Sequence, residues 1–442
     1  MPSNSARKGP LSWIRCACLA FASLLPAIAT AGIELYKTDE SKLDFNATFV
    51  GALFQNSSWF GQSEEFLGGN TDSWGEFGTE LGLAWEYTSG KSTVFAELSG
   101  IYTATGSNDA SGLTIGLDKT SRASLEQAHL GWRYDDPFKG LEEDTFSLTV
   151  GRQDFLIGSG LLIADGHSDG AERGGWYIGL RKAFQESVIA SLKSKTLLAE
   201  GFFIQNTPRR GGTQGEAVGG NFEYTFDESL TAAATYMVVN PKLADTNNLD
   251  VWSWRLGWKG LGGLELNGEY VIENSDQVNA DGWYAQAAWA FSDTTWSPWI
   301  AYRYAVFSGD DPLTVKNETF NSLAYGYTDY GSWYQGEITG NYPLGNGNLE
   351  SNQFRIKAKP NDSLTLNLLY YSFKLEEPGT LSPDVTSKNW GDEIDFTADW
   401  AVTDNWYLIG VAAVLFPGDA AVQWTGGNND WWYGMLNASY TF

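Results

Sequence analysis

The sequence is poor in residues that carry thiol, metal or nucleophilic chemistry. Its only cysteines are Cys16 and Cys18, and its only histidines are His129 and His167. Both cysteines lie in an N-terminal stretch with the features of a removable export signal, so the rest of the chain has no thiols for disulfides or for zinc. We therefore expect no cofactor and no metal site.

Basic residues are also scarce. The chain has 28 Lys and Arg against 54 Asp and Glu, which gives a formal net charge of −26. So acidic a surface argues against nucleic acid as a partner. A soluble secreted β-protein would tolerate the same charge, so the charge alone does not decide between a soluble and a membrane protein.

Long apolar runs are missing beyond the first 31 residues. Residues 1–31 combine a basic start, an apolar run of about a dozen residues and Ala29-Thr30-Ala31 before Gly32, as in a cleaved secretory signal of the Sec pathway. The alternative, a membrane anchor, needs about 18 to 20 apolar residues, whereas this run is shorter and contains Pro26. We predict a signal peptide over residues 1–31 and a single domain over residues 32–442.

Aromatic residues and glycine are plentiful, with 20 Trp, 21 Tyr, 24 Phe and 50 Gly. The last residues, WWYGMLNASYTF, place apolar or aromatic side chains at every second position, with polar Asn437 and Ser439 between them. A period of two marks a strand whose faces meet different surroundings. Because the polar positions are small and uncharged and the other face is aromatic, the pattern is typical of a strand with lipid on one side.

Alternating segments recur along the chain. In FGTELGLAWEY, Phe77, Leu81 and Trp85 share one face, and Glu76 and Glu80 share the other. The same pattern occurs in AHLGWRY, VWSWRLGWK, GLELNGEYVI, GWYAQAAWAF, PWIAYRYAV, QFRIKAKP and SLTLNLLYYSF. We predict an all-β transmembrane antiparallel barrel of 18 strands, with 16 as the alternative count.

Short turns and long loops are predicted to alternate between the strands. The short turns fall at Ser89 to Lys91, Phe184 to Ser187, Phe226 to Ser229, Lys259 to Gly263, Phe291 to Thr295, Lys359 to Ser363 and Val402 to Asn405. The longer connections are rich in Gly, Asn and Asp. If the short turns face the periplasm, both termini lie on that side and the long loops lie outside the cell.

The C-terminal aromatic side chains suggest how the barrel is assembled. Phe442 and Tyr440 resemble the terminal signature by which outer-membrane barrels are recognised for assembly. The expected partners are therefore the barrel-assembly machinery and the lipid and lipopolysaccharide of a Gram-negative outer membrane.

Two blocks of sequence resemble a known family. The first, VGRQDFLIGSGLLIADGHSDGAERGGWYIGLRKAF, contains Gly151-Arg152-Gln153 and then a loop rich in Gly and Asp that includes Arg173. The second runs from Phe307 to Tyr342 and includes Ser308-Gly309-Asp310-Asp311. Both blocks resemble the alginate-export family of outer-membrane barrels. The resemblance implies an 18-stranded barrel that conducts an anionic polysaccharide through a basic lumen gated by loops.

Projecting the alternation onto the barrel places two kinds of charge in the lumen. Candidate pore-lining cations are His129, Arg133, Arg152, Arg173, Arg181, Lys193, Arg255, Arg303, Arg355 and Lys357. An acidic wall is formed by Glu76, Glu80, Glu86, Glu97, Glu393, Asp395 and Asp399. Arg152 shares parity with Val150, so it faces the lumen only if Gly151 marks a bulge. The cations either meet the solute or simply pair with neighbouring carboxylates.

The segment from Phe307 to Glu350 is long enough to fold inward as a constriction. Its aromatic residues Tyr325, Tyr327, Tyr330, Trp333 and Tyr334 would then stack on sugar rings or pack the loop against the wall.

We predict a channel for passive transport of polar or anionic solutes, saccharide or polysaccharide among them. The alternative is a general or substrate-specific porin for small solutes. An outer-membrane hydrolase is the less favoured reading, because His129 projects into the lumen and only His167 lies beside a serine, Ser168.

Overall fold

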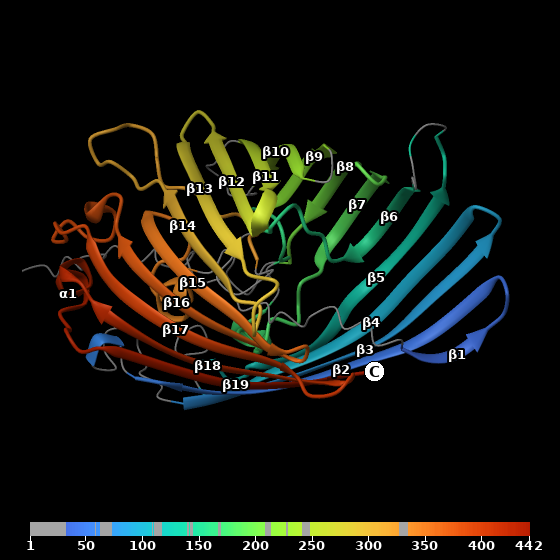
Figure 1. Cartoon of the computed structure of the whole chain (residues 1–442), viewed down its shortest axis with the longest axis horizontal. Helices are drawn as coiled ribbons and strands as arrows, with labels where there is room; N and C mark the ends of the chain where they lie inside the picture. Colours follow the sequence, from blue (N-terminus) through green and yellow to red (C-terminus); the bar gives the residue numbers. More distant parts are fainter. Residues whose placement is uncertain are drawn as a thin grey trace, which may run out of the picture.

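The protein is described from a computed structural model. The description covers residues 32–57, 59–61, 73–107, 109, 117–138, 141, 145–166, 169–207, 214–226, 229–240, 248–326 and 335–442. The predicted signal peptide, residues 1–31, lies outside these described residues. Figure 1 shows long tilted strands arranged around a central space, with chain segments inside it.

Nineteen strands are assigned within the described residues. They are β1 (Ile33–Lys37), β2 (Ser41–Asn56), β3 (Ser73–Ser89), β4 (Ser92–Gly106), β5 (Ser121–Asp135), β6 (Thr145–Gln153), β7 (Phe184–Lys193), β8 (Leu197–Gln205), β9 (Glu216–Phe226), β10 (Leu230–Asn240), β11 (Leu249–Lys259), β12 (Leu264–Asn274), β13 (Asn279–Ala290), β14 (Trp299–Phe307), β15 (Leu349–Asn361), β16 (Leu364–Lys374), β17 (Asn389–Ala401), β18 (Trp406–Pro417) and β19 (Trp431–Thr441). The helical pieces are α1 (Asp419–Thr425), 3₁₀ turns at Trp59–Gly61, Ala171–Arg173, Leu261–Gly263 and Pro378–Thr380, and a π-helix at Gly336–Gly340.

The strands form one closed antiparallel barrel. Each strand from β2 to β19 pairs with its neighbours in the sequence, and β19 pairs with β2 to close the ring. The remaining strand, β1, pairs with β2 beyond the end of β19. The ring therefore has the 18 strands predicted from the sequence. Among the described residues, no helix has both the length and the apolar character needed to cross a membrane.

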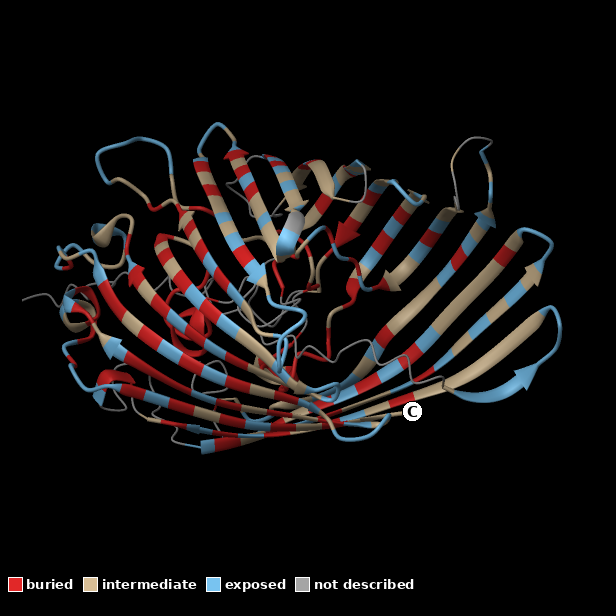
Figure 2. Ribbon diagram, viewed as in Figure 1, coloured by how far each residue is buried: buried red, intermediate tan, exposed pale blue. Residues whose placement is uncertain are grey.

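The two faces of each strand differ as the alternation predicts, which Figure 2 shows as bands of burial along the strands. On β19, Trp432 and Leu436 point outward and are 58% and 68% exposed, whereas Asn437 and Ser439 point inward and are buried. Lipid would surround the outward side chains. The closed ring satisfies the backbone hydrogen bonds that lipid cannot satisfy.

One predicted turn is wrong. Phe184 to Ser187 begins β7, and the turn that follows this strand lies at residues 194–196. The apolar positions Trp176, Ile178 and Leu180 alternate like a strand, but they belong to a loop that is buried inside the barrel. The strand parity that was used to project Arg181 is therefore also wrong, and Arg181 lies in this loop.

The first described strand, β1, and the C-terminus lie at the end of the barrel that carries the short turns (Figure 1). The backbone N–H of Phe442 donates to the carbonyl of Ala47 at 3.1 Å, and the N–H of Ala47 donates to the carbonyl of Phe442 at 2.9 Å. Next along β2, Ile33 lies opposite Phe45. The β19 edge of β2 is thus occupied by the C-terminal strand and then by β1.

Candidate functional site

Two long loops fold into the barrel and constrict it. The first lumen loop, described over residues 154–166 and 169–183, connects β6 to β7, and the second, described over residues 308–326 and 335–348, connects β14 to β15. Many of their side chains are buried, among them Tyr177, Ile178, Ile338 and Tyr342. The inward fold predicted for the second loop is observed, and Tyr325 packs in the buried core. The other aromatic residues named for this loop, Tyr327, Tyr330, Trp333 and Tyr334, lie outside the described residues.

The two lumen loops are joined by main-chain hydrogen bonds. Ile163 and Ala324 form a parallel bridge. The N–H of Ala324 donates to the carbonyl of Leu162 at 3.0 Å, and the N–H of Ala164 donates to the carbonyl of Ala324 at 2.8 Å. Segments from opposite halves of the sequence therefore meet inside the lumen.

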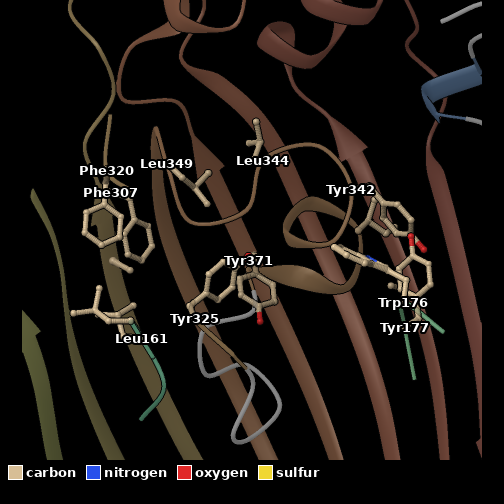
Figure 3. Packing of buried hydrophobic residues seen from close by; sticks show 14 of the residues in the cluster. Leu161, Trp176, Tyr177, Phe307, Phe320, Tyr325, Tyr342, Leu344, Leu349 and Tyr371 are labelled. Carbon is tan, nitrogen blue, oxygen red and sulfur yellow. The ribbon is translucent and has the colours of Figure 1, made fainter. Parts of the chain in front are cut away.

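A second contact between the loops is aromatic. Figure 3 shows Trp176 and Tyr177 of the first loop beside Tyr342 of the second, and the rings of Tyr177 and Tyr342 are 5.7 Å apart. Tyr342 also lies 5.3 Å from the inward-facing ring of Trp431 on β19. Phe54 of β2 completes the group at 5.3 Å from Tyr177. This burial of aromatic area favours the inward position of both loops.

Carboxylates of the barrel wall hold the first lumen loop. Glu76 of β3 accepts hydrogen bonds from the N–H groups of Tyr177 and Ile178 at 2.8 and 3.0 Å. Glu126 of β5 accepts one from the N–H of Ala183 at 2.8 Å. These bonds satisfy loop backbone groups that are buried away from the strand ladders.

The second lumen loop is held in the same way. Glu393 of β17 accepts hydrogen bonds from the N–H groups of Ile338 and Thr339 at 2.6 and 2.9 Å, within the π-helix Gly336–Gly340. Asp395, two residues along β17, accepts one from the N–H of Glu337 at 3.1 Å. Another wall carboxylate, Glu273 of β12, accepts from the N–H of Asn321 at 2.8 Å. Of these residues, Glu126 and Glu273 were not identified from the sequence.

The predicted acidic wall therefore divides into two groups. Glu76, Glu393 and Asp395 are buried beneath the loops that they hold. The others bond to neighbouring side chains: Glu80 accepts from Ser99 at 2.5 Å, Glu86 lies 3.4 Å from Arg133, Glu97 lies 4.0 Å from His129, and Asp399 accepts from Tyr407 and Asn367, both at 3.3 Å.

A bulge turns Arg152 toward the lumen. By simple alternation Arg152 would share the outer face with Val150, so an irregularity at Gly151 was the condition for an inward side chain. The register of β6 against β7 shifts between Gly151 and Gln153, and Gly151 has a φ of +131°. Val150 remains on the outer face, whereas Arg152 donates to Thr207 at 2.8 Å and lies 3.3 Å from Glu126. The bulge therefore re-aims a single side chain.

Guanidinium groups gather where the first lumen loop meets β4 to β6. Arg173 donates to the carbonyl of Thr207, which also binds Arg152 through its hydroxyl. Arg181 donates to the hydroxyls of Thr103 and Ser124 and to the carbonyl of Arg122. Burial lowers the pKa of Arg173 to about 10, and repulsion from Arg122, Arg181 and Arg152 contributes to the shift. The guanidinium is still charged at neutral pH.

The other predicted cations lie on the strands. Arg255 of β11 pairs with Glu223 at 2.9 Å, and Arg355 of β15 donates to Asn367. Lys357 lies over the ring of Trp299 at 4.7 Å from its centre. Arg303 is buried on β14, and Lys193 is exposed at the end of β7. His167 lies outside the described residues.

Comparison with known proteins supports both the fold and the resemblance. The family model for alginate export matches residues 247–430. This range contains the second of the two sequence blocks, and the alginate-export resemblance is confirmed there. No curated protein matches the chain.

The barrel is similar to several solved structures. OccAB2 of Acinetobacter baumannii is 12% identical with a TM-score of 0.57, and the match covers 90% of this chain and 98% of that one. OpdO of Pseudomonas aeruginosa is 14% identical with a TM-score of 0.56, over 90% and 97% of the two chains. OccD3 (OpdP) of Pseudomonas aeruginosa is 12% identical with a TM-score of 0.54, over 90% and 91%. At these identities the likeness concerns the fold.

The predicted fold class and location are confirmed by the 18-stranded barrel together with the alginate-export match, which indicate a Gram-negative outer-membrane protein of the channel type.

Proposed function

We propose that this protein is an outer-membrane channel for anionic solutes of the sugar-acid class, in which guanidinium groups at the lumen constriction select the solute. The observation that carries the proposal is the gathering of Arg122, Arg152, Arg173 and Arg181 beside the first lumen loop. Arg122 is exposed and Arg152 is partly exposed, whereas Arg173 and Arg181 are buried and would act through their field. Carboxylates lie beside three of these arginines: Glu126 beside Arg152, Glu172 beside Arg173 and Asp169 beside Arg181. Because Arg122 and Arg152 are the more exposed members of the group, their charge would favour the entry of anions.

The use of the acidic residues supports the same function. Glu76, Glu393 and Asp395 point into the barrel but are covered by the loops whose N–H groups they bind. A passing solute would not meet these three carboxylates directly. Four other cations of the wall lie on β11, β14 and β15, namely Arg255, Arg303, Arg355 and Lys357. Arg303 and Arg355 are buried and Arg255 is paired with Glu223, so their effect on the solute would be weaker.

Ion selectivity tests the proposal. The purified protein is reconstituted in a planar bilayer, and the reversal potential is measured across a KCl gradient. We expect anion preference, and we expect Arg122→Glu to lower the anion-to-cation permeability ratio by about threefold, because a nearby charge changes the local ion concentration on this scale. Arg122 is exposed on β5, so the variant should still fold. Cation preference of the unchanged protein would contradict the proposal.

A second candidate, a channel for small solutes, is favoured by the bridge between the lumen loops. Main-chain hydrogen bonds at Ile163 and Ala324 link segments across the lumen, and a polysaccharide chain would have to pass beside them. Liposomes that contain the protein separate the candidates. Uptake of a monomeric uronate while a labelled polyuronate is retained supports the small-solute channel, and passage of the polymer supports polysaccharide export.

We also propose that the protein carries out no covalent chemistry. His129 is packed in the wall beside Glu97 and against the ring of Phe95, 6.3 Å away, an arrangement that suits a structural residue. Alanine substitution of His129 and of His167 should leave transport unchanged. A hydrolytic activity that is lost in either variant would restore the enzyme hypothesis.

Finally, we propose that residues 1–31 are removed during export and that the barrel-assembly machinery recognises the C-terminal strand. The rings of Tyr440 and Trp406 have centres 5.0 Å apart and are tilted by 58°, and the ring of Phe442 lies 6.1 Å from that of Phe45 across the closing seam. Deletion of residues 441–442 should impair insertion into the outer membrane. Normal assembly of the shortened chain would contradict this role.

A further inference from the structure

One ion pair in the lumen is produced by irregularities in two neighbouring strands. Glu126 of β5 and Arg152 of β6 approach to 3.3 Å, and the register of the sheet is interrupted beside each of them. Bulges commonly occur where a side chain is re-aimed for a function.

The irregularity in β5 lies against β4. Leu98 is opposite Ala128, but Gly100 is opposite Leu125, so β5 has an additional residue at this point. The N–H of Gln127, which the ladder leaves without its regular partner, donates to the hydroxyl of Ser99 at 2.8 Å. The shift lets Glu126 point into the barrel on one side of the irregularity and His129 on the other.

The irregularity in β6 requires a glycine. Gly151 has a φ of +131°, and a Cβ atom at this position would lie 2.3 Å from the carbonyl oxygen of Ala128 and 2.8 Å from the Cα of His129. Both obstacles are backbone atoms that cannot move aside. The conformation turns the next residue, Arg152, from the lipid face to the lumen.

The two partners are buried to different extents. The Glu126 side chain is 1% exposed, and its two oxygens are used separately: one accepts the N–H of Ala183 at 2.8 Å and the other faces Arg152. The Arg152 side chain is 13% exposed and directs a second nitrogen to Thr207. The carboxylate is thus hidden beneath the loop, and the guanidinium is the partner that a solute can reach.

We propose that Glu126 is a positioning residue for Arg152 and that the pair contributes to the charge selectivity of the channel. Glu126 fixes the guanidinium against Thr207 and compensates part of its charge, while it also anchors the first lumen loop. The inference rests on the proposed function, because selectivity is a property of the open channel.

A double-mutant cycle tests the inference, with the reversal potential across a KCl gradient as the readout. Glu126→Gln removes the negative charge but keeps an oxygen for the N–H of Ala183, so we expect a permeability ratio about threefold more in favour of anions. Arg152→Gln should shift the ratio about threefold the other way. The permeability ratio of the double variant should be close to that of the unchanged protein, because the positive and the negative charge are both absent.

Two controls make the outcome specific. Glu97→Gln removes another inward carboxylate that lies beside His129, and it should shift selectivity less than Glu126→Gln. Folding of each variant is checked by heat-dependent migration in detergent gels. If Glu126 serves only the loop, Glu126→Gln will change the conductance or its noise without shifting selectivity, and the double variant will not return to the original ratio; either result overturns the inference.

The experiment separates this inference from the proposed function. If the unchanged protein prefers cations but the two single variants still shift the ratio in opposite directions, the anion channel is wrong and the role of the pair holds. If the unchanged protein prefers anions and neither variant shifts the ratio, the pair has no such role.

Discussion

The two lumen loops are anchored alike but carry different residues. Each lies inside the barrel, and each has buried N–H groups bound by carboxylates of the wall. The first loop brings Arg173 and Arg181 to the constriction beside Arg152. The buried part of the second loop brings Glu337, Ile338 and Tyr342. The comparison suggests that the first loop supplies charge for the solute and the second supplies packing that holds the first in place.

The largest effect is expected from removal of the anchors of the second loop. Glu393→Ala with Asp395→Ala removes the acceptors of three loop N–H groups, and each buried N–H left without a partner costs about 1 to 3 kcal/mol. We expect noisy single-channel currents and cleavage of residues 335–348 by external protease. Glu76→Ala, which removes the acceptor of two N–H groups of the first loop, should have a smaller effect.

The matched control for these anchors is Glu393→Gln with Asp395→Asn. Because Glu393 uses one oxygen for Ile338 and the other for Thr339, this variant keeps an acceptor for two of the three loop N–H groups. It should disturb the current and the protection from protease less than the alanine variant does. Equal damage from the alanine and amide variants would show that the charge, and not the hydrogen bonds, holds the loop.

The next effect concerns the aromatic contact between the loops. Tyr342→Ala removes a ring that packs on Tyr177, Trp431 and Tyr433, and loss of a buried aromatic side chain costs about 3 to 5 kcal/mol. We expect lower thermal stability and flickering of the open channel, measured by heat-dependent gel migration and by single-channel recording. Tyr342→Phe keeps the ring and should behave as the unchanged protein does.

A smaller effect on ion selectivity is expected from charge changes in the loops, and it should differ between the first loop and the second. Arg173→Gln removes a cation of the first loop and should lower the anion-to-cation permeability ratio by about twofold to threefold. Glu337→Gln removes a buried acidic residue of the second loop and should change the ratio little, because Glu337 is 1% exposed and a passing ion does not meet it directly. Equal and opposite shifts would show that the second loop also sets selectivity.

The smallest effect is expected outside the constriction. Lys316 belongs to the second loop but is exposed, and it donates to the carbonyl of Ser275 at 2.8 Å. Lys316→Ala should change neither the current nor the melting behaviour. A change in selectivity would extend the functional part of this loop to its outer half.

The barrel was predictable because its strands repeat one simple rule. Every wall strand separates lipid from a polar interior, so residues such as Trp432 and Asn437 must alternate. The rule fails for the first lumen loop. Trp176, Ile178 and Leu180 are apolar at every second position, as in a strand that faces lipid, but they are buried inside the barrel. This alternation produced the incorrect turn at Phe184 to Ser187.

The candidate site was predictable only in part. Parity placed Glu76 and Glu393 on the inner face, but it could not tell which backbone groups they bind, because those groups come from loops about 55 to 100 residues away. Parity also missed Glu126, since the irregularity in β5 changes the count of residues. Arg152 was predicted to face the lumen only if Gly151 marked a bulge, and the structure has an irregularity at Gly151; the role of Arg152 in the pore stays a prediction.

At the closing seam of the barrel, the C-terminal strand β19 and the first strand β1 lie end to end along the same edge of β2. Phe442 lies opposite Ala47 on β2, Ile33 lies opposite Phe45, and Gly32 occupies the one position between them. A peptide bond from Phe442 to Gly32 would continue β19 into β1 in register and without a linker. If residues 1–31 are removed as proposed, we expect the barrel to tolerate circular permutation, with new ends opened at another short turn such as that around Gly90.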